Sequence, residues 1–149
     1  MTYLMTIDSG NTHVKWGLHD GSNWLEQGTI TQDKSILLQQ EWKSLPTPHG
    51  IIISNVSSID TKKKLSELLS CWKVEPKWIT PLVYQCGVRN YYADPSLLGS
   101  DRWAALIAAW NWQQKGCLVV DVGTAMTVDA LSDTGEFLGG IIVPGFKLM

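Results

Sequence analysis

The chain has 149 residues, of which 44% are hydrophobic and 17% are charged, and its formal net charge is −2 at pH 7. This composition is typical of a globular protein with one good core, and the charge balance excludes a basic surface for nucleic acid or anionic membrane. No apolar stretch reaches transmembrane length, and three widely spaced cysteines favour the reduced thiols of a cytoplasmic protein over a disulfide framework or a zinc site.

The apolar patterns along the chain predict an α/β fold. Residues 3–7, 13–19 and 24–31 are separated by turn residues, which predicts an antiparallel three-stranded meander. A continuous apolar run at residues 50–54 is typical of a parallel strand that is covered on both faces. The other expected elements are helices at 33–45, 58–72 (with Asp60 or Thr61 near its cap) and 100–114, a strand at 77–79 and a loop-rich stretch at 82–98.

Two segments of the chain are similar to each other, and each ends a strand on a glycine turn. They are Ile7-Asp8-Ser9-Gly10-Asn11-Thr12 and Val120-Asp121-Val122-Gly123-Thr124-Ala125, and 121 − 8 gives an offset of 113 residues. The same offset pairs Leu18 with Leu131, Asp20 with Asp133, Trp24 with Phe137, and Leu25 with Leu138. A duplicated strand–turn–strand unit indicates two related half-molecules, with the phosphates of a nucleotide between the two turns.

The chemistry of each turn suits phosphate. Gly10 and Gly123 allow a tight turn and a close approach of the backbone to a ligand. Backbone N–H groups in such a turn can form an anion-binding concavity, to which Asn and Thr side chains add polar contacts. A carboxylate beside a phosphate needs a bridging cation, so Asp8 and Asp121 indicate metal ions. One Asp-x-Gly sequence is a common structural turn, and the second copy in a matching context is what favours a phosphate site.

The second copy is short. It begins at Cys117 and comprises 149 − 117 + 1 = 33 residues, fewer than the roughly 40 below which unaided domains become rare. We therefore expect a first domain at residues 1–115 and an incomplete second domain at 116–149, in a truncated form of a longer protein. Residues 144–149 are typical of the opening of a helix, and the second sheet is expected to lack the helices that would cover it.

A third candidate site lies between the two copies, at Gly99-Ser100-Asp101-Arg102. These residues begin the helix expected at 100–114, and a helix N-terminus favours bound anions. Asp101 can accept a hydroxyl proton, and Arg102 can clamp a carboxylate in a fork geometry. The structural alternative is that Ser100 or Asp101 is the N-cap and Arg102 is a surface residue.

Taken together, the motifs resemble those of the type III pantothenate kinases. They are Asp-x-Gly-Asn-Thr from Asp8, Tyr-(x)6-Gly-x-Asp-Arg from Tyr92, Asp-x-Gly-Thr-Ala-x-Thr from Asp121 and Gly-Gly-x-Ile-x-Pro-Gly from Gly139. The family belongs to the actin-like acetate and sugar kinase/Hsc70 superfamily. The resemblance therefore implies a duplicated ribonuclease-H-like (actin-like ATPase) fold of the α/β class, here with the second copy incomplete. Members of the family continue well beyond Met149, through an adenosine-binding motif and a further pantothenate-contacting threonine.

The resemblance implies ATP-dependent phosphorylation of pantothenate to 4′-phosphopantothenate, the first step of coenzyme A biosynthesis, in a cytoplasmic homodimer. Asp101 would be the proton acceptor, Asp8 would lie near Mg²⁺ bound with ATP, and Asp121 would hold a monovalent cation, either K⁺ or NH₄⁺. Pantothenate would be held by Tyr92, Gly99, Ser100, Asp101 and Arg102. The ATP-binding residues would be Asp8, Ser9, Gly10, Asn11, Thr12, His13, Val14, Lys15 and Thr124.

Two other functions fit the same residues. The chain could be a non-catalytic accessory or regulatory binding module of the same fold, and an incomplete second domain favours this alternative. The retained acidic and basic groups Asp8, Asp101, Arg102 and Asp121 argue against it, because a binding module does not need all of them. A kinase for another small hydroxylated substrate, such as a sugar or a short carboxylic acid, is the remaining alternative. Potassium-dependent ATP turnover would distinguish a kinase from a binding module.

Overall fold

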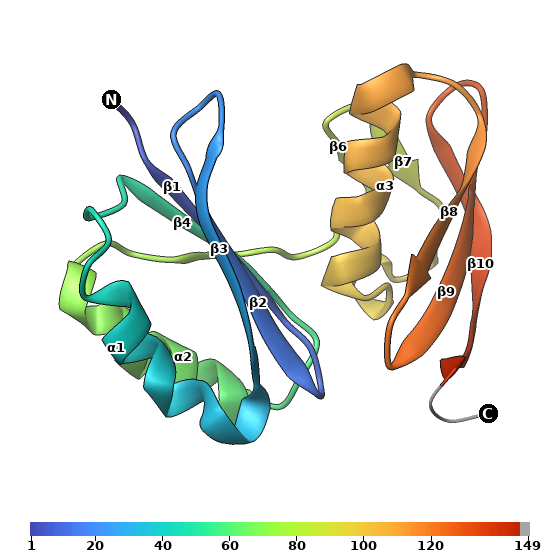
Figure 1. Cartoon of the computed structure of the whole chain (residues 1–149). Coiled ribbons are helices and arrows are strands. Elements are labelled where there is room, and N and C mark those ends of the chain that lie inside the picture. Colours follow the sequence, from blue (N-terminus) through green and yellow to red (C-terminus); the bar gives the residue numbers. More distant parts are fainter. Residues whose placement is uncertain (147–149) are drawn as a thin grey trace. The chain divides into compact units, whose positions relative to one another are not determined.

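The computed structural model describes residues 1–146, and the chain divides into two compact units, Met1–Ile79 and Thr80–Met149 (Figure 1). This division follows the packing of the chain, so the segment at 80–115 belongs with the second unit. The division expected at residues 115/116 follows the sequence repeat instead, and it stays a prediction about where the two copies begin and end.

Unit 1 contains a five-stranded sheet in the order β3-β2-β1-β4-β5. The antiparallel meander predicted for the start of the chain is confirmed, because β1 pairs with β2 and β2 with β3 in antiparallel register. Strand β4 adds to the other edge of β1 in parallel, and β5 follows it in parallel. The bounds are β1 Leu4–Ser9, β2 His13–His19, β3 Trp24–Thr31, β4 Gly50–Asn55 and β5 Lys77–Trp78.

The helices of unit 1 differ in detail from those expected. The helix expected at 33–45 is a 3-10 helix η1 (Gln32–Leu37) continued by a short α-helix α1 (Leu38–Trp42). The second helix is α2 (Ile59–Leu69), followed by the 3-10 turn η2 (Ser70–Trp72). Its N-cap is Ser58, whose hydroxyl accepts a hydrogen bond from the Thr61 amide at 3.2 Å. Asp60 and Thr61 thus lie in the first turn, close to the cap, as expected.

One face of this sheet packs against the helices and forms the core of unit 1. Trp42 of α1 is edge-on to Trp16 of β2, at 6.1 Å between ring centroids, and it stacks on Trp72 at 5.3 Å. On β4, the side chains of Ile51 and Ile53 are buried, while Ile52 between them is exposed. The expectation that this strand is covered on both faces was therefore wrong, because helices cover only one face. The core comprises Met5, Ile7, Val14, Trp16, Leu18, Leu38, Trp42, Leu45, Ile51, Ile53, Leu65, Leu68 and Leu69.

Unit 2 contains a second five-stranded sheet, in the order β6-β7-β10-β9-β8, with helix α3 (Ser100–Gln113) on one of its faces (Figure 1). Trp103 of α3 is completely buried, and its indole N–H donates to Gln85 Oε1 at 2.8 Å, whereas Trp112 of the same helix is 89% exposed. The other elements are β6 Tyr84–Gln85, β7 Val88–Asn90, the 3-10 turn η3 Pro95–Leu97, β8 Cys117–Val122, β9 Ala125–Leu131 and β10 Glu136–Pro144.

Strand pairing shows the predicted repeat and corrects its register. Ile7 pairs with Trp16 in unit 1, and Val120 pairs with Val128 in unit 2. The offset between the copies is therefore 113 residues in the first strand and 128 − 16 = 112 in the second, because the turn in unit 2 is one residue shorter. The equivalence of Leu18 with Leu131 was wrong, since Leu18 pairs with Met5 and the matching partner of Leu118 is Ala130.

The third strand of each copy returns to the offset of 113. In unit 1, β3 has an irregularity between the pairs Leu18–Glu26 and His19–Trp24. In unit 2, the register shifts at the matching place, between Phe137 and Gly139 of β10. Trp24 and Phe137 are thus equivalent, as the sequence predicted. The two copies share a bulge as well as a strand order.

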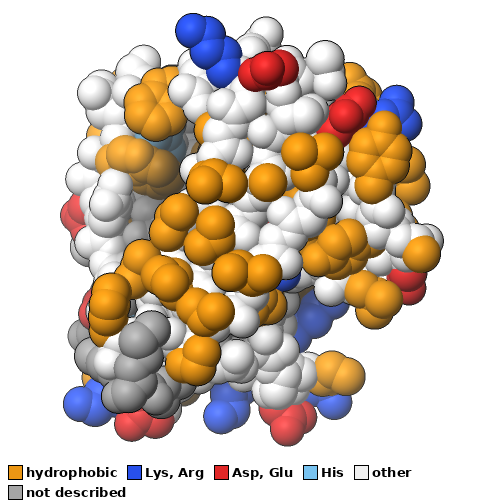
Figure 2. All heavy atoms as spheres, turned by 90° about the vertical axis from the view of Figure 1, so that its right-hand side faces the viewer, with side chains coloured by type: hydrophobic (Ala, Val, Ile, Leu, Met, Phe, Trp, Pro, Cys, Tyr) orange, Lys and Arg blue, Asp and Glu red, His pale blue; other side chains and the backbone are white. Residues whose placement is uncertain are grey.

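The face of the unit 2 sheet that is turned away from α3 is apolar and uncovered. Met5 and Ile7 of β1 are buried, but Leu118 and Val120, at the equivalent positions of β8, are 68% and 54% exposed. Figure 2 shows hydrophobic side chains gathered over this face. The predicted lack of cover on the second sheet is confirmed for this face only, because α3 covers the other face. The helix opening predicted at 144–149 falls in part on residues 147–149, which lie outside the described residues.

Candidate functional site

The first predicted phosphate turn joins β1 to β2 in unit 1. The amide of Gly10 donates to the carbonyl of His13 at 2.9 Å, so this N–H closes the turn and is not offered to a ligand. The side chains of Ser9 and Val14 are buried toward the core, while those of Asp8, Asn11, Thr12 and Lys15 are exposed. Asp8 and Lys15 are directly paired across the two strands. The turn therefore presents polar and charged side chains on the side opposite the core.

Gln32, which the sequence motifs did not single out, holds this turn in place. Its side-chain Nε2 donates to the carbonyl of Gly10 at 2.6 Å and to Ser9 Oγ at 3.0 Å. Its backbone N–H donates to the carbonyl of Thr12 at 2.9 Å. The first residue of η1 thus fixes three successive parts of the turn. Only the polar character of Gln32 at the start of a helix could have suggested this from the sequence.

The second predicted phosphate turn, between β8 and β9, is built in the same way. The amide of Gly123 donates to the carbonyl of Ala125 at 3.0 Å, as Gly10 does in the first turn. The carbonyl of Thr124 accepts a hydrogen bond from the amide of Gly145 at 3.0 Å. A Cβ atom on Gly145 would lie 2.2 Å from the Gly123 carbonyl oxygen, so only glycine permits this approach. The two turns share their closing hydrogen bond and their exposed polar side chains.

The predicted substrate segment is ordered by a buried asparagine. Asn90, at the end of β7, is 3% exposed, and its Oδ1 accepts a hydrogen bond from the Tyr92 amide at 3.0 Å. Its Nδ2 donates to the carbonyl of Pro95 at 3.4 Å. The Tyr92 ring packs against Phe137 of β10, with ring centroids 5.2 Å apart. These contacts place Tyr92 next to the start of α3.

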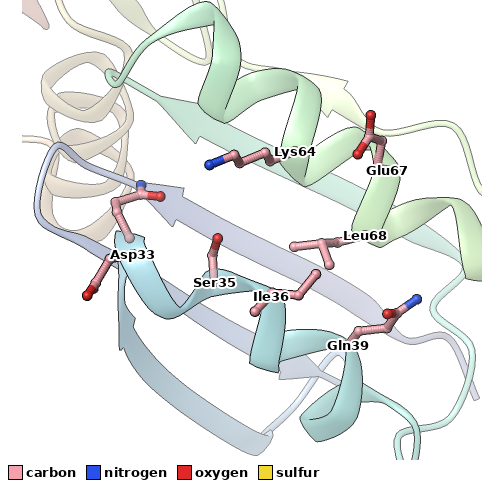
Figure 3. Close-up of a pocket in the computed structure, with 8 residues that line it drawn as sticks. Asp33, Ser35, Ile36, Gln39, Lys64, Glu67 and Leu68 are labelled. Carbon is pink, nitrogen blue, oxygen red and sulfur yellow. The ribbon is translucent and has the colours of Figure 1, made fainter.

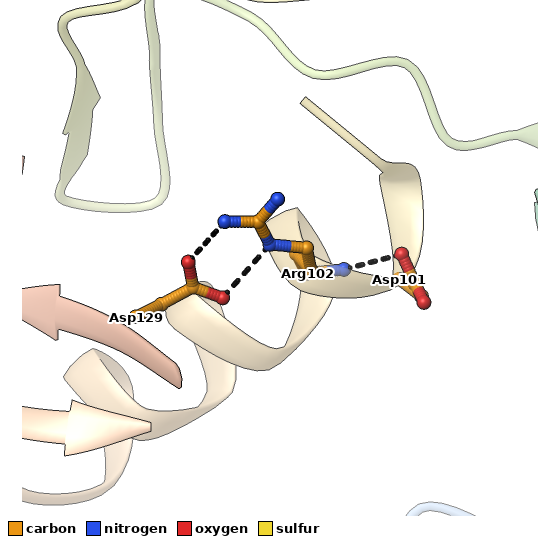
Figure 4. Close-up of polar contacts among 3 residues, drawn as sticks. All are labelled: Asp101, Arg102 and Asp129. Atoms are coloured by element: carbon orange, nitrogen blue, oxygen red, sulfur yellow. Dashed lines mark hydrogen bonds and ion pairs between the residues drawn. The ribbon is translucent and has the colours of Figure 1, made fainter. Parts of the chain in front are cut away.

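Asp101 and Arg102 occupy the first turn of α3, and their side chains point in different directions (Figure 4). The N-cap of the helix is Gly99, so the alternative in which Ser100 or Asp101 is the N-cap was wrong. Asp101 Oδ1 accepts a hydrogen bond from the Arg102 amide at 2.8 Å, and Asp101 is half-buried. The alternative of a surface arginine was also wrong, because Arg102 is 8% exposed.

Arg102 forms a two-point ion pair with Asp129 of β9, a residue that the motifs missed. Nε donates to Asp129 Oδ2 at 3.0 Å and Nη2 donates to Oδ1 at 2.5 Å (Figure 4). The fork that was expected for a substrate carboxylate is thus occupied by a carboxylate of the protein. The hydrogen bonds that Arg102 donates to Asp129 raise the pKa of Arg102 most, burial opposes them, and a smaller contribution comes from Tyr92.

The acidic residues predicted to bind cations suit such a role by their chemistry. Asp121 is exposed near the end of β8 and lies opposite Thr127 on β9. A carboxylate beside hydroxyl and carbonyl oxygens is a hard donor set of the kind that binds K⁺, and a single carboxylate such as Asp8 can hold Mg²⁺ together with phosphate oxygens. Within residues 1–146, no group of three or more His, Cys, Asp or Glu side chains could hold a metal without other ligands.

A separate pocket of about 400 Å³ lies in unit 1, between η1–α1 and α2. Figure 3 shows Lys64, Glu67 and Leu68 from α2 facing the residues of η1 and α1. None of the predicted site residues lines it, but one of its lining residues is Gln32, which holds the first phosphate turn. The lining residues are Gln32, Asp33, Ser35, Ile36, Gln39, Lys64, Glu67 and Leu68.

The fold is similar to those of several solved structures. An exopolyphosphatase from Cytophaga hutchinsonii superposes with a TM-score of 0.58 at 11% identity, over 98% of this chain and 52% of that one. The ethanolamine utilization protein EutJ from Carboxydothermus hydrogenoformans gives 0.57 at 10% identity, over 97% and 53%. At such low identity these likenesses show the fold alone, and they confirm the predicted actin-like α/β architecture. No helix within residues 1–146 is long and apolar enough to cross a membrane.

The sequence defines the family within this fold. A family model described as type III pantothenate kinase matches residues 4–149, so the chain belongs to the type III pantothenate kinase family. The type III pantothenate kinase of Nitrosospira multiformis is 64% identical over 146 residues, and that of Nitrosomonas eutropha is 57% identical over 145. The chain spans about 56% of the length of each of these relatives. The predicted family is confirmed.

Proposed function

We propose that this chain carries the phosphate turns and the acceptor-substrate segment of an enzyme that phosphorylates pantothenate with ATP, in the first step of coenzyme A biosynthesis. The observation that carries the proposal is the match to the family over residues 4–149, which includes both equivalently closed turns and the first turn of α3. The exposure of the Asn11, Thr12 and Thr124 side chains supports the proposal that they contact phosphate oxygens.

The reaction requires that the terminal hydroxyl of pantothenate lose its proton as it attacks the γ-phosphorus. A new P–O bond forms, the bond between the γ-phosphorus and the β–γ bridging oxygen breaks, and ADP leaves. Asp101 accepts the hydroxyl proton and orients the nucleophile, and its place at the start of α3 leaves its carboxylate outside the Arg102–Asp129 ion pair. Positioning and neutralisation of charge supply most of the rate enhancement in phosphoryl transfer.

Cations complete the proposed site. Asp8 would hold Mg²⁺ bound with ATP, and Asp121 would hold K⁺ or NH₄⁺, which together offset the repulsion between these carboxylates and the phosphates. We further propose that the enzyme acts in the cytoplasm as a homodimer. The exposed indole of Trp112 on α3 is a candidate for the contact between subunits.

The test is a phosphorylation assay with ATP, Mg²⁺ and pantothenate, with and without K⁺, in which phosphopantothenate is detected by mass spectrometry. Two proteins are compared: the 149-residue chain, and a chimera of this chain with the remaining part of the Nitrosospira multiformis relative. Potassium-dependent product from the chimera supports the proposal. A folded chimera that binds pantothenate but forms no product with either cation would favour the non-catalytic binding module.

A further inference from the structure

The contact between Arg102 and Asp129 is a buried ion pair. Arg102 is 8% exposed and Asp129 is 1% exposed, and the pair joins the first turn of α3 to the middle of β9. A buried ion pair of this kind is weak evidence for stability, because apolar side chains of similar volume often serve as well. The presence of the pair at the start of the substrate segment therefore calls for another reason.

We propose that Asp129 is a positioning residue that aims Arg102 at the carboxylate of the acceptor substrate. Two of the three guanidinium nitrogens, Nε and Nη2, donate to Asp129, and this fixes the plane of the group. The third nitrogen, Nη1, points away from Asp129 (Figure 4). This inference deepens the proposed function and rests on it.

The surroundings of the pair point to an anchor for one carboxylate. Tyr92 lies beside the guanidinium and is held there by Asn90 and Phe137. Arg102 Nη1 and the Tyr92 hydroxyl, which interacts with the guanidinium, are both groups that can donate to an anion. Because Asp129 already neutralises the guanidinium, recognition depends on the direction of the N–H groups more than on net positive charge. Such an anchor selects a carboxylate at one end of the substrate. The hydroxyl whose proton Asp101 accepts lies at the other end.

The backbone of β10 is adapted to the pair. A Cβ atom at Gly140 would lie 1.8 Å from Asp129 Oδ1 and 2.8 Å from Arg102 Nη2. Gly140 therefore gives the two side chains the space in which they meet. Asp129, Arg102 and Gly140 act as one unit, and a shift of any member would redirect the free edge of the guanidinium.

The test compares the binding of pantothenate with that of its alcohol analogue, in which the carboxylate is replaced by a hydroxymethyl group. Both titrations are followed by NMR on the 149-residue chain and on its Asp129→Asn, Asp129→Glu and Asp133→Asn variants. Asp133 is an exposed residue of the β9–β10 turn and serves as the control. We expect the unaltered chain and the control to prefer pantothenate, and both Asp129 variants to lose about tenfold of that preference, the size of one charge-assisted hydrogen bond.

The affinity for the alcohol analogue distinguishes a positioning role of Asp129 from a merely structural one. Loss of a positioning residue would weaken the binding of pantothenate only, whereas a structural defect would weaken the binding of both compounds equally. Asp129→Asn leaves Arg102 without its charge partner and can fail to fold, in which case Asp129→Glu, which keeps the charge but moves the guanidinium, decides the matter. A preference within twofold of the original in a folded Asp129 variant overturns the inference and leaves the proposed function intact. An unaltered chain that binds neither compound, alone or in the chimera, overturns the proposed function and the inference with it.

Discussion

Replacing Gly140 by alanine should destabilise unit 2 far more than a glycine-to-alanine change usually does. The added Cβ would lie 1.8 Å from Asp129 Oδ1 and 2.6 Å from the carbonyl oxygen of Val128. The carbonyl belongs to the backbone of β9 and cannot move aside, so the carboxylate must leave its position. Overpacking costs about 1–3 kcal/mol, and separation of a buried ion pair costs about 3–5 kcal/mol. Because the two effects overlap, we expect a loss of about 3–5 kcal/mol in the free energy of unfolding.

Native-state hydrogen exchange of the α3 amides measures this loss in unit 2 alone. The matched control is Gly123→Ala, because a Cβ atom there would lie 3.7 Å from its nearest neighbour, the Ala125 carbonyl oxygen, which is ordinary contact. We expect the control to change the free energy of unfolding by less than about 1 kcal/mol. If both variants lose the same amount, the close packing of Gly140 against the Arg102–Asp129 pair is refuted.

Two further predictions follow from equivalent strands and from a capped turn. Ile7→Thr should cost about 2–4 kcal/mol of unfolding free energy, because it places a hydroxyl in the core. Val120→Thr, at the equivalent exposed position, should cost less than about 0.5 kcal/mol. Equal losses of unfolding free energy for the two variants in urea would contradict the difference in cover between the two sheets. Asp94 accepts hydrogen bonds from Ser96, and these lower the pKa of Asp94 in the folded state. Its contribution to stability is therefore present above its pKa in the unfolded state, about 3.9, and is lost as the pH falls through its lower pKa in the folded state. The stability difference between the unaltered chain and Asp94→Asn should therefore shrink below about pH 4, and a difference that stays constant from pH 3 to 7 would show that the cap does not titrate.

The sequence was most informative where structure is local. The strand positions of both copies followed from alternating apolar residues and turn residues, and the equivalence of Trp24 with Phe137 survived in the strand pairing. The one-residue difference between the two turns was not visible, because Leu18 finds an apolar match at either Ala130 or Leu131. Strand pairing, which depends on backbone hydrogen bonds, was needed to choose between these registers.

The side chains that support the candidate site could not be predicted, because their partners are distant in the chain. Asp129 lies 27 residues from Arg102 and belongs to none of the motifs. Gln32 lies more than 20 residues from the turn that it holds. An aspartate in a strand and a glutamine at the start of a helix are common, and only the tertiary packing gives these two residues their partners.

The most direct test of the central claim is the rate of phosphopantothenate formation by the chimera carrying Asp101→Asn. Its matched control is Asp60→Asn, because Asp60 and Asp101 both occupy the second position of an α-helix, in α2 and α3 respectively. The account predicts that Asp101→Asn lowers the rate by about 10²-fold or more with ATP affinity retained, and that Asp60→Asn leaves the rate unchanged. Equal rates for the two variants would contradict the assignment of Asp101 and the active site built around it.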